Sequence, residues 1–341
     1  MENQASSRHQ PPATAVVLLN WNGWRDTLAC LESLAALEGD DFYVIVVDNA
    51  STDGSWEALK AGADKLGGAG LDPRWQVLSR AASEGGDIPA AGRRSVWLIQ
   101  AGENGGFAKG NNVGLRVALR HGVQFAWVLN NDTLVRPDSL RELVARAEQD
   151  PKLGMVGSIL LYASHPNVIQ AFGGATYFYG KARGTQIGSG QDITMADFKA
   201  LGRERLDYVA GASMLVRAEL MRSVGLFAEH YFLYFEEIDW AQRARHDWRL
   251  GTADKSIVWH KEGASIGTAT LTKRSLLSEY YLARNLILFY GGHLPWLLGV
   301  AVLRNLREAL GMCLRREDSK RIATVLRATW HGVIRKTGAT H

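Results

Sequence analysis

The sequence is poor in cysteine, and its N-terminus lacks an apolar segment. Its two cysteines, Cys30 and Cys313, lie far apart in 341 residues and match no spacing typical of a metal site. Such sparse cysteine usage favours a reducing compartment. Residues 1–13 are polar and contain two prolines, so they do not resemble a signal peptide, and we expect a disordered leader there.

A run of 19 residues without formal charge lies between Arg284 and Arg304. It is long enough for a transmembrane helix, but Gly291, Gly292 and Pro295 interrupt it. We therefore expect two shorter helices, one or both lying on a membrane surface, in preference to a span.

Positive charge is concentrated at the C-terminus. Residues 273–341 contain twelve Lys or Arg against four Asp or Glu, whereas the whole chain carries a net charge of +4. A basic tail favours contact with an anionic partner, and our first candidate is an anionic membrane surface. Nucleic acid is not expected, because the chain lacks a helix-turn-helix, a zinc finger and an RNP-like aromatic pattern. A homo-oligomer interface is a further candidate use of the tail.

Short apolar runs alternate with helical patterns through the first 135 residues. The runs at 15–19, 43–47, 96–99 and 125–129 have the length of buried strands. This alternation predicts an α/β fold with a mainly parallel central sheet covered on both faces. Residues 62–95 are rich in Gly and Ala with little periodicity, so we expect an inserted surface loop there.

After residue 153 the pattern changes to short strands, and the last seventy residues are helical by pattern. Residues 173–190 are rich in glycine and aromatic residues and predict a hairpin. Residues 208–216 read as a buried strand interrupted at Gly211, and a glycine within a strand often marks the close approach of a ligand.

Polar residues follow three of the predicted strands: Asn20, Asp48 and the triplet Asn130-Asn131-Asp132. The carboxyl ends of parallel strands meet at one edge of a sheet, where such sheets bind ligands. An acidic residue at this edge can hold a divalent metal, and the metal can carry a diphosphate. Taken singly, each of these residues can also be explained as a turn or a helix cap.

A glycine-rich segment at 104–112 follows the third predicted strand and leads into a helix. Its glycines let the backbone approach a phosphate, and a helix N-terminus favours an anion. The spacing is neither Gly-x-Gly-x-x-Gly nor that of a P-loop. The alternative is a plain glycine-rich loop with an exposed Lys109.

Glu236, Glu237 and His260 are the remaining candidates for chemistry. Aromatic surroundings can raise the pKa of a carboxyl group toward neutrality and make it a general base, although carboxylates at helix N-termini are commonly solvated. Asp239 and Arg243 have the spacing of a surface ion pair. His260 follows an apolar run and is either structural or, with Asp132, part of a site with mixed oxygen and nitrogen ligands.

Together these segments resemble the ordered motifs of family 2 glycosyltransferases over roughly residues 14–270. Five elements carry the resemblance: the nucleotide signature at 46–55, the Asn-x-Gly-Phe-Ala-x-Gly-Asn-Asn-x-Gly-like segment at 104–114, the Asp-x-Asp-like triplet at 130–132, the Glu-Asp-like base motif at 234–239, and His260 with Gly263 and Ser265. The subgroup that they resemble most is the bacterial rhamnosyltransferase-like enzymes of surface polysaccharide assembly.

The resemblance implies a GT-A domain at 14–272, with a nucleotide-binding half at 14–135 and an acceptor half at 136–272. A basic helical extension follows at 273–341. It also implies inverting transfer of a sugar from a nucleotide-diphosphosugar to a hydroxyl of a glycan or lipid-linked glycan, with Mg²⁺ or Mn²⁺. The first expected donor is dTDP-rhamnose, and a UDP-hexose or UDP-N-acetylhexosamine is the alternative.

Site roles follow from the resemblance by position. Glu237 would be the catalytic base; Asp132 and His260 would bind the metal; Asn20, Asp48, Gly106, Phe107, Lys109 and Asn131 would bind the nucleotide; and Gly211, Ala212, Glu236, Asp239 and Trp240 would lie on the acceptor side. Two positions depart from the family pattern. Asn130 stands at the first acid of the metal motif, and Glu237 stands where Asp is usual.

Two other classes of function fit parts of the sequence. A non-catalytic glycan-binding homologue would not need Asp132, Glu237 and His260 together. A nucleotidyltransferase would carry a glycine-rich basic loop after the first strand, where residues 20–25 fit poorly. We therefore expect a cytoplasmic enzyme, peripheral at the inner face of the cytoplasmic membrane. Its C-terminal extension would be a tether that takes no part in the chemistry.

Overall fold

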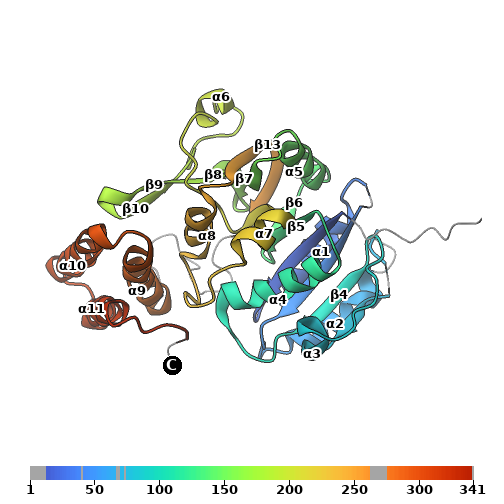
Figure 1. The fold of residues 1–341 in the computed structure, drawn as a ribbon, viewed down its shortest axis with the longest axis horizontal. Coiled ribbons are helices and arrows are strands. Elements are labelled where there is room, and N and C mark those ends of the chain that lie inside the picture. Colours follow the sequence, from blue (N-terminus) through green and yellow to red (C-terminus); the bar gives the residue numbers. More distant parts are fainter. Residues whose placement is uncertain (1–12, 40, 67–69, 73, 262–274, 340–341) are drawn as a thin grey trace, which may run out of the picture.

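A mixed sheet of ten strands forms the centre of the computed structural model, which describes residues 13–39, 41–66, 70–72, 74–261 and 275–339 (Figure 1). The strand order is β3-β4-β2-β1-β5-β12-β7-β13-β6, with β8 paired to β7. The strands are β1 Thr14–Asn20, β2 Phe42–Asp48, β3 Gln76–Leu78, β4 Val96–Gln100, β5 Phe125–Asn130, β6 Thr133–Val135, β7 Leu153–Tyr162, β8 His165–Phe172, β12 Ser213–Arg217 and β13 Arg249–His260. All pairs from β3 to β5 are parallel, as the sequence predicts.

Helices cover both faces of this sheet, because successive side chains of its strands point to opposite faces. Val16 and Leu18 belong to a core shared with α1, α2 and α5, whereas Val17 and Ile45 belong to a core shared with α4. These helices are α1 Trp24–Ala35, α2 Ser55–Leu66, α4 Gly106–Arg120 and α5 Ser139–Glu148. The predicted α/β class with a mainly parallel sheet is therefore confirmed.

Helix α4 lies unusually close to the sheet. A Cβ atom on Gly110 would lie 2.4 Å from Leu19 Cδ1, and one on Gly114 would lie 2.6 Å from Val17 Cγ1. The helix begins at Gly106, within the glycine-rich segment that was expected to precede it. The glycine-rich segment is thus the first part of the helix itself, and the close packing holds it against the end of β1.

The interpretation of residues 62–95 as a plain inserted loop is wrong. Helix α2 continues to Leu66, β3 extends the sheet beside β4, and α3 (Arg80–Glu84) packs on α4. The half-buried Arg94 joins the end of this segment to α1, because its guanidinium donates to the carbonyls of Ala35, Leu37, Gly39 and Gly70. Short elements with few apolar residues leave little periodicity in the sequence.

A hairpin and a short strand make a second, three-stranded sheet in the described part of the chain. Strands β9 (Gly174–Phe178) and β10 (Arg183–Gln186) form the predicted hairpin, joined by η1 (Tyr179–Lys181), and β11 (Tyr208–Val209) pairs with β9. Residues 210–212 separate β11 from β12, so the predicted strand is interrupted at Gly211 as expected. Three smaller helices complete this half of the molecule: α6 Phe198–Leu201, α7 Ala218–Val224 and α8 Glu236–Ala244.

The C-terminal extension is a group of three packed helices, at the left of Figure 1, toward which the hairpin extends. They are α9 Leu276–His293, α10 Leu298–Leu314 and α11 Ser319–Val333, with η2 (Pro295–Leu297) between the first two. The break at Pro295 confirms two separate helices over the uncharged run. Within the described ranges, no helix has the length and apolarity needed to span a bilayer.

Arg94→Ala should lower the free energy of unfolding by about 2 kcal/mol, because the hydrogen bonds from a charged group to four backbone carbonyls, two of them partly buried, are lost. Chemical denaturation of both proteins measures this. Arg93→Ala, at the neighbouring exposed arginine, is the control and should change stability by less than about 0.5 kcal/mol. Equal effects of the two substitutions would show that Arg94 does not anchor the segment.

Candidate active site

The polar strand ends meet at one edge of the sheet, as predicted. Asn20 lies opposite Asp48 in the β1–β2 pair, and Leu19 lies opposite Asn130 in the β1–β5 pair. Asn131 continues this edge, donating from Nδ2 to Thr27 Oγ1 at 2.9 Å. The register of the parallel strands therefore assembles the polar edge that the sequence indicates.

Asp48 is wholly buried and supports the loop that follows β2. Its carboxylate accepts hydrogen bonds from Asn20 Nδ2 at 2.7 Å, from Ser51 N at 3.1 Å and from Ser51 Oγ at 2.6 Å. Both oxygens thus have partners within the protein. Direct contact of Asp48 with a nucleotide stays a prediction, and its observed contacts give it a supporting position.

Asn49 connects this loop to the glycine-rich segment, and the sequence analysis did not single it out. Its Nδ2 donates to Asn104 Oδ1 at 2.9 Å and to the Gly106 carbonyl at 3.2 Å, while its Oδ1 accepts from Gly105 N at 3.3 Å. The signal that could have indicated Asn49 is its position directly after Asp48 in the segment 46–55. Its buried amide holds two loops of the site together.

Gly106 allows the start of α4 to touch the loop before α8. Its φ is +80°, and a Cβ atom there would lie 2.1 Å from the Phe232 carbonyl oxygen. The next amide, Phe107 N, donates to that carbonyl at 2.7 Å. Lys109 lies one turn further on with its ammonium group paired to the exposed Glu103. Gly106 and Phe107 thus join the start of α4 to the loop before α8.

Asp132 and His260 lie side by side, as predicted. His260 Nε2 is 3.2 Å from Asp132 Oδ1, a distance within the range of an ion pair but without hydrogen-bond geometry. Asn130 Nδ2 is 3.3 Å from the same ring nitrogen. The pairing of β13 with β6 places His260 opposite Thr133 and so brings the histidine to the metal motif.

Asp132 and His260 provide one oxygen and one nitrogen atom that could bind a cation. His260 Nδ1 lies 3.0 Å from Gln170 Oε1, and a ring that donates from Nδ1 to that amide oxygen keeps its Nε2 lone pair for Asn130 Nδ2 or for a cation. Asp132 Oδ1 is buried and accepts no hydrogen bond. Two such atoms fit a divalent ion of mixed ligand preference. The described residues contain no cluster of three acidic, His or Cys ligands, so diphosphate or water would complete the shell. Gly263 and Ser265 lie outside the described residues.

Glu237 lies at the N-terminus of α8 against the backbone of Gly211. A Cβ atom on Gly211 would lie 2.2 Å from Glu237 Oε1. The next residue, Ala212, accepts a hydrogen bond through its carbonyl from Asn130 N at 3.0 Å. The predicted base thus lies beside the strand end that carries the metal motif, and Gly211 and Ala212 lie between them.

The neighbouring carboxyl of Glu236 is almost fully buried, and its Oε1 has no hydrogen-bond partner. Burial raises the pKa of Glu236 well above its ordinary value, and the charge of Glu237 raises it further. Burial also raises the pKa of Glu237, which is half-buried. Two adjacent acids in apolar surroundings do not both ionise easily, and this favours a proton-accepting role for the more exposed Glu237.

Two residues assigned to the acceptor side are internal. Trp240 is fully buried in the core, where its indole donates to the Gly225 carbonyl at 2.8 Å. Asp239 is also buried and binds Arg243 Nε at 2.7 Å, so the expected pair forms inside the protein and not on its surface. Burial opposes ionisation of Asp239, but the bonds from His293 and Arg243 lower its pKa overall. The buried face of α8 depends on packing partners far away in the sequence.

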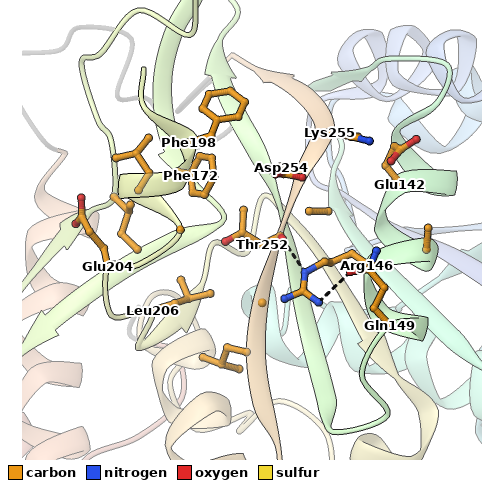
Figure 2. Close-up of a pocket in the computed structure, with 17 residues that line it drawn as sticks. Glu142, Arg146, Gln149, Phe172, Phe198, Glu204, Leu206, Thr252, Asp254 and Lys255 are labelled. Carbon is orange, nitrogen blue, oxygen red and sulfur yellow. Dashed lines mark hydrogen bonds between the residues drawn. The ribbon is translucent and has the colours of Figure 1, made fainter. Parts of the chain in front are cut away.

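Figure 2 shows a hollow of about 660 Å³ on another side of the sheet, between α5, β13 and the segment around α6. Arg146 lines it and donates to the Thr252 carbonyl at 3.2 Å, with Phe172 and Phe198 on the opposite wall. None of the predicted site residues lines this hollow, so we do not assign the chemistry to it.

Comparison with known proteins identifies the family. The family described as "Glycosyltransferase like family 2" matches residues 11–276. The chain belongs to this family. Its motifs therefore belong to a family 2 glycosyltransferase, and the strand-end site described above is the region where those motifs meet.

Known relatives and structures are consistent with this assignment. The chain is 25% identical over 153 residues to "Low-salt glycan biosynthesis hexosyltransferase Agl10" of Haloferax volcanii, covering 45% of this chain and about half (47%) of that relative. The fold resembles the mannosyltransferase PcManGT of Pyrobaculum calidifontis in complex with GDP-Man and Mn²⁺ (TM-score 0.54, 16% identity, 96% and 88% of the two chains). It also resembles S. aureus TarS 1-349 in complex with UDP-GlcNAc (TM-score 0.51, 14% identity, 93% and 90%). The expected GT-A fold is confirmed.

Glu236→Gln should raise the melting temperature at pH 7.5, with a smaller gain at pH 4.5. A folded-state pKa above the unfolded value of about 4.3 means that the native state binds more protons, so stability falls as pH rises through that window. Below it, protonated Glu236 and Gln are equivalent. The exposed Glu219→Gln is the control, and a gain at Glu236 that is equal at both pH values would exclude ionisation as its cause.

Proposed function

We propose that this family 2 glycosyltransferase inverts the anomeric centre while it moves a sugar from a nucleotide-diphosphosugar to a hydroxyl of a glycan or lipid-linked glycan, with Glu237 as the base. The observation that supports this most strongly is the contact of Glu237 with Gly211, beside the strand end that carries Asp132. The proposed base then lies beside the proposed diphosphate-binding edge. Donor and acceptor must be held together between them for reaction.

Different residues would act on the nucleophile and on the leaving group. Glu237 takes the proton of the acceptor hydroxyl as its oxygen attacks the anomeric carbon, which passes through an oxocarbenium-like transition state. Asn20, Asp48, Gly106, Phe107, Lys109 and Asn131 would frame the nucleotide. A divalent ion held by Asp132 and His260 would supply positive charge to the departing diphosphate. The dipole at the N-terminus of α4 also favours the same anion.

The donor is proposed from resemblance. We keep dTDP-rhamnose first, with a UDP-hexose or UDP-N-acetylhexosamine as the alternative. The name of the Haloferax relative supports a hexose, and the two structural neighbours were crystallised with GDP-Man and UDP-GlcNAc. The pyrimidine and purine donors differ in the size of the base, so a binding panel separates them directly.

Glu237→Gln should lower turnover by roughly 10²-fold or more while nucleotide affinity changes little, because a general base contributes about 10²–10⁴-fold. Release of nucleoside diphosphate from the donor measures turnover. Glu236→Gln is the matched control and should have a smaller effect, since its carboxyl is buried behind the site. A loss confined to donor affinity at Glu237 would mean that another residue is the base.

The metal assignment is tested by thermal shift with dTDP, UDP and GDP, each with and without Mn²⁺. A ligand that binds only the folded state raises the melting temperature with the logarithm of its concentration. Asp132→Ala should abolish the Mn²⁺-dependent part of the shift, whereas Asp138→Ala, at the start of α5, should keep it. An intact metal-dependent shift in Asp132→Ala would place the ion elsewhere.

We also propose that the outer face of the C-terminal helices binds an anionic membrane. Four leucines, Leu303, Leu306, Leu310 and Leu314, follow one face of α10 and are 47%, 45%, 59% and 76% exposed. On α11, Leu326, Trp330 and Val333 are also exposed. Arg307, Arg315 and Lys181 border a groove beside α10. Exposed apolar residues flanked by basic ones favour a lipid surface, and the shared positive charge disfavours a second copy of the chain.

Leu306→Asp with Leu310→Asp should abolish binding of the full chain to vesicles that contain anionic lipid. The apolar contact is lost and negative charge is added next to the lipid phosphates. Met195→Asp, at an exposed apolar residue outside the C-terminal helices, is the control and should bind normally. Wild-type release at high salt supports a peripheral contact. No vesicle binding by the wild-type chain, together with dimers that the double variant abolishes, would assign this face to oligomerisation.

A further inference from the structure

The loop that leads into the proposed base has an unusual backbone. Residues 231–235 precede α8, and three of them, Phe232, Tyr234 and Phe235, have φ values of 72°, 67° and 77°. Residues other than glycine rarely adopt this left-handed region, because Cβ then crowds the following carbonyl. Such a conformation persists only where neighbouring groups impose it. The groups that impose it here come from the C-terminal extension.

Asn285 of α9 holds the carbonyl groups of this loop. Its side chain is fully buried, and Nδ2 lies 3.0 Å from the Tyr231 carbonyl, 2.7 Å from that of Leu233 and 3.0 Å from that of Tyr234. The amide has two hydrogens, so the three carbonyls share them. One side chain therefore fixes the direction of three carbonyl groups of the loop.

Arg284 orients that amide and adds a bond of its own. Its Nε donates to Asn285 Oδ1 at 2.9 Å, which directs the amide nitrogen toward the loop. Its Nη2 donates to the Tyr231 carbonyl at 2.6 Å. The guanidinium is also fully buried and lies over the Tyr281 ring, 4.8 Å from its centroid. A buried cation whose partners are backbone carbonyls is well suited to shape a loop.

The same loop is held from the other sides. The Phe232 carbonyl accepts the bond from Phe107 N at the start of α4. At the far end of α9, His293 Nε2 lies 2.6 Å from Asp239 Oδ1 in the first turn of α8. Helix α9 thus contacts both the loop before Glu237 and the helix after it. The position of the Glu237 carboxylate relative to Gly211 depends on these contacts.

We infer that Arg284 and Asn285 are positioning residues for catalysis, which act by holding the loop 231–235 so that Glu237 faces the acceptor hydroxyl. The inference rests on the proposed role of Glu237 as base. It also revises the expectation that the extension only tethers the enzyme, because α9 would then be part of the catalytic unit. A misplacement of a reacting group by about 1 Å can cost on the order of 10²-fold in rate.

The chain offers a matched control for Asn285. Asn305 of α10 is equally buried, and its Nδ2 donates to the Ala283 carbonyl at 2.9 Å and to Thr329 Oγ1 at 3.0 Å, within the three helices and away from the loop. Asn285→Ala and Asn305→Ala should therefore lower the melting temperature by similar amounts. Only Asn285→Ala should lower kcat, by about 10–100-fold, with KM for the donor nearly unchanged. Asn285→Ser, which keeps one donor, should lie between, and it replaces the alanine variant if that does not fold.

Two measurements separate this inference from the proposed function. In amide hydrogen exchange of the full chain without ligand, Asn285→Ala should speed exchange of residues 231–237, and Asn305→Ala should not. In a double-mutant cycle, Asn285→Ala should reduce kcat no further once Glu237 is Gln. Unchanged exchange at 231–237, equal kcat losses for the two asparagine variants, or an undiminished loss in the Glu237→Gln background would each overturn the inference. Full turnover of Glu237→Gln alone would instead overturn the assignment of the base.

Discussion

The hydrogen bond from the Phe107 amide to the Phe232 carbonyl joins the two halves of the molecule where their functional elements meet. On one side of it lie the start of α4 and the polar strand ends; on the other lie the loop 231–235 and Glu237. The approach requires glycine at 106, since any Cβ there would overlap the carbonyl. Backbone atoms therefore set the spacing between the nucleotide side and the base. This suits a reaction whose rate depends on holding two substrates at a fixed distance.

The sequence predicts the parts of the site that follow directly from strand periodicity. Buried parallel strands read as apolar runs, so the polar residue after each run marks the edge of the sheet, as at Asn20, Asp48 and Asp132. The motif order of the family adds Glu237 and His260, which no periodicity would indicate. The structure brings Asp132 next to His260, and Glu237 next to Gly211. Their chemical roles stay predictions until the variants are measured.

Other features depend on distant packing and leave no local signal. Trp240 and Asp239 lie close to Glu237 in the sequence, yet they face inward because the end of α7 and α9 cover that side of α8. Strand β3 was missed because three residues show no periodicity and its pairing with β4 is a tertiary contact. Asn285 was missed because its partners are backbone carbonyls, which are the same in every sequence. The signal that the sequence offered was an Arg next to an Asn within an otherwise apolar helical pattern.

The extension therefore has two faces with different surroundings. Its inner face, through Arg284, Asn285 and His293, meets the loop 231–235 and α8. Its outer face carries the leucines of α10, and α10 also contacts η1 at the tip of the hairpin. The hairpin sheet includes Tyr208, whose pKa is raised by burial and by the nearby Glu237 carboxylate. A continuous series of contacts thus connects the proposed membrane face to the base.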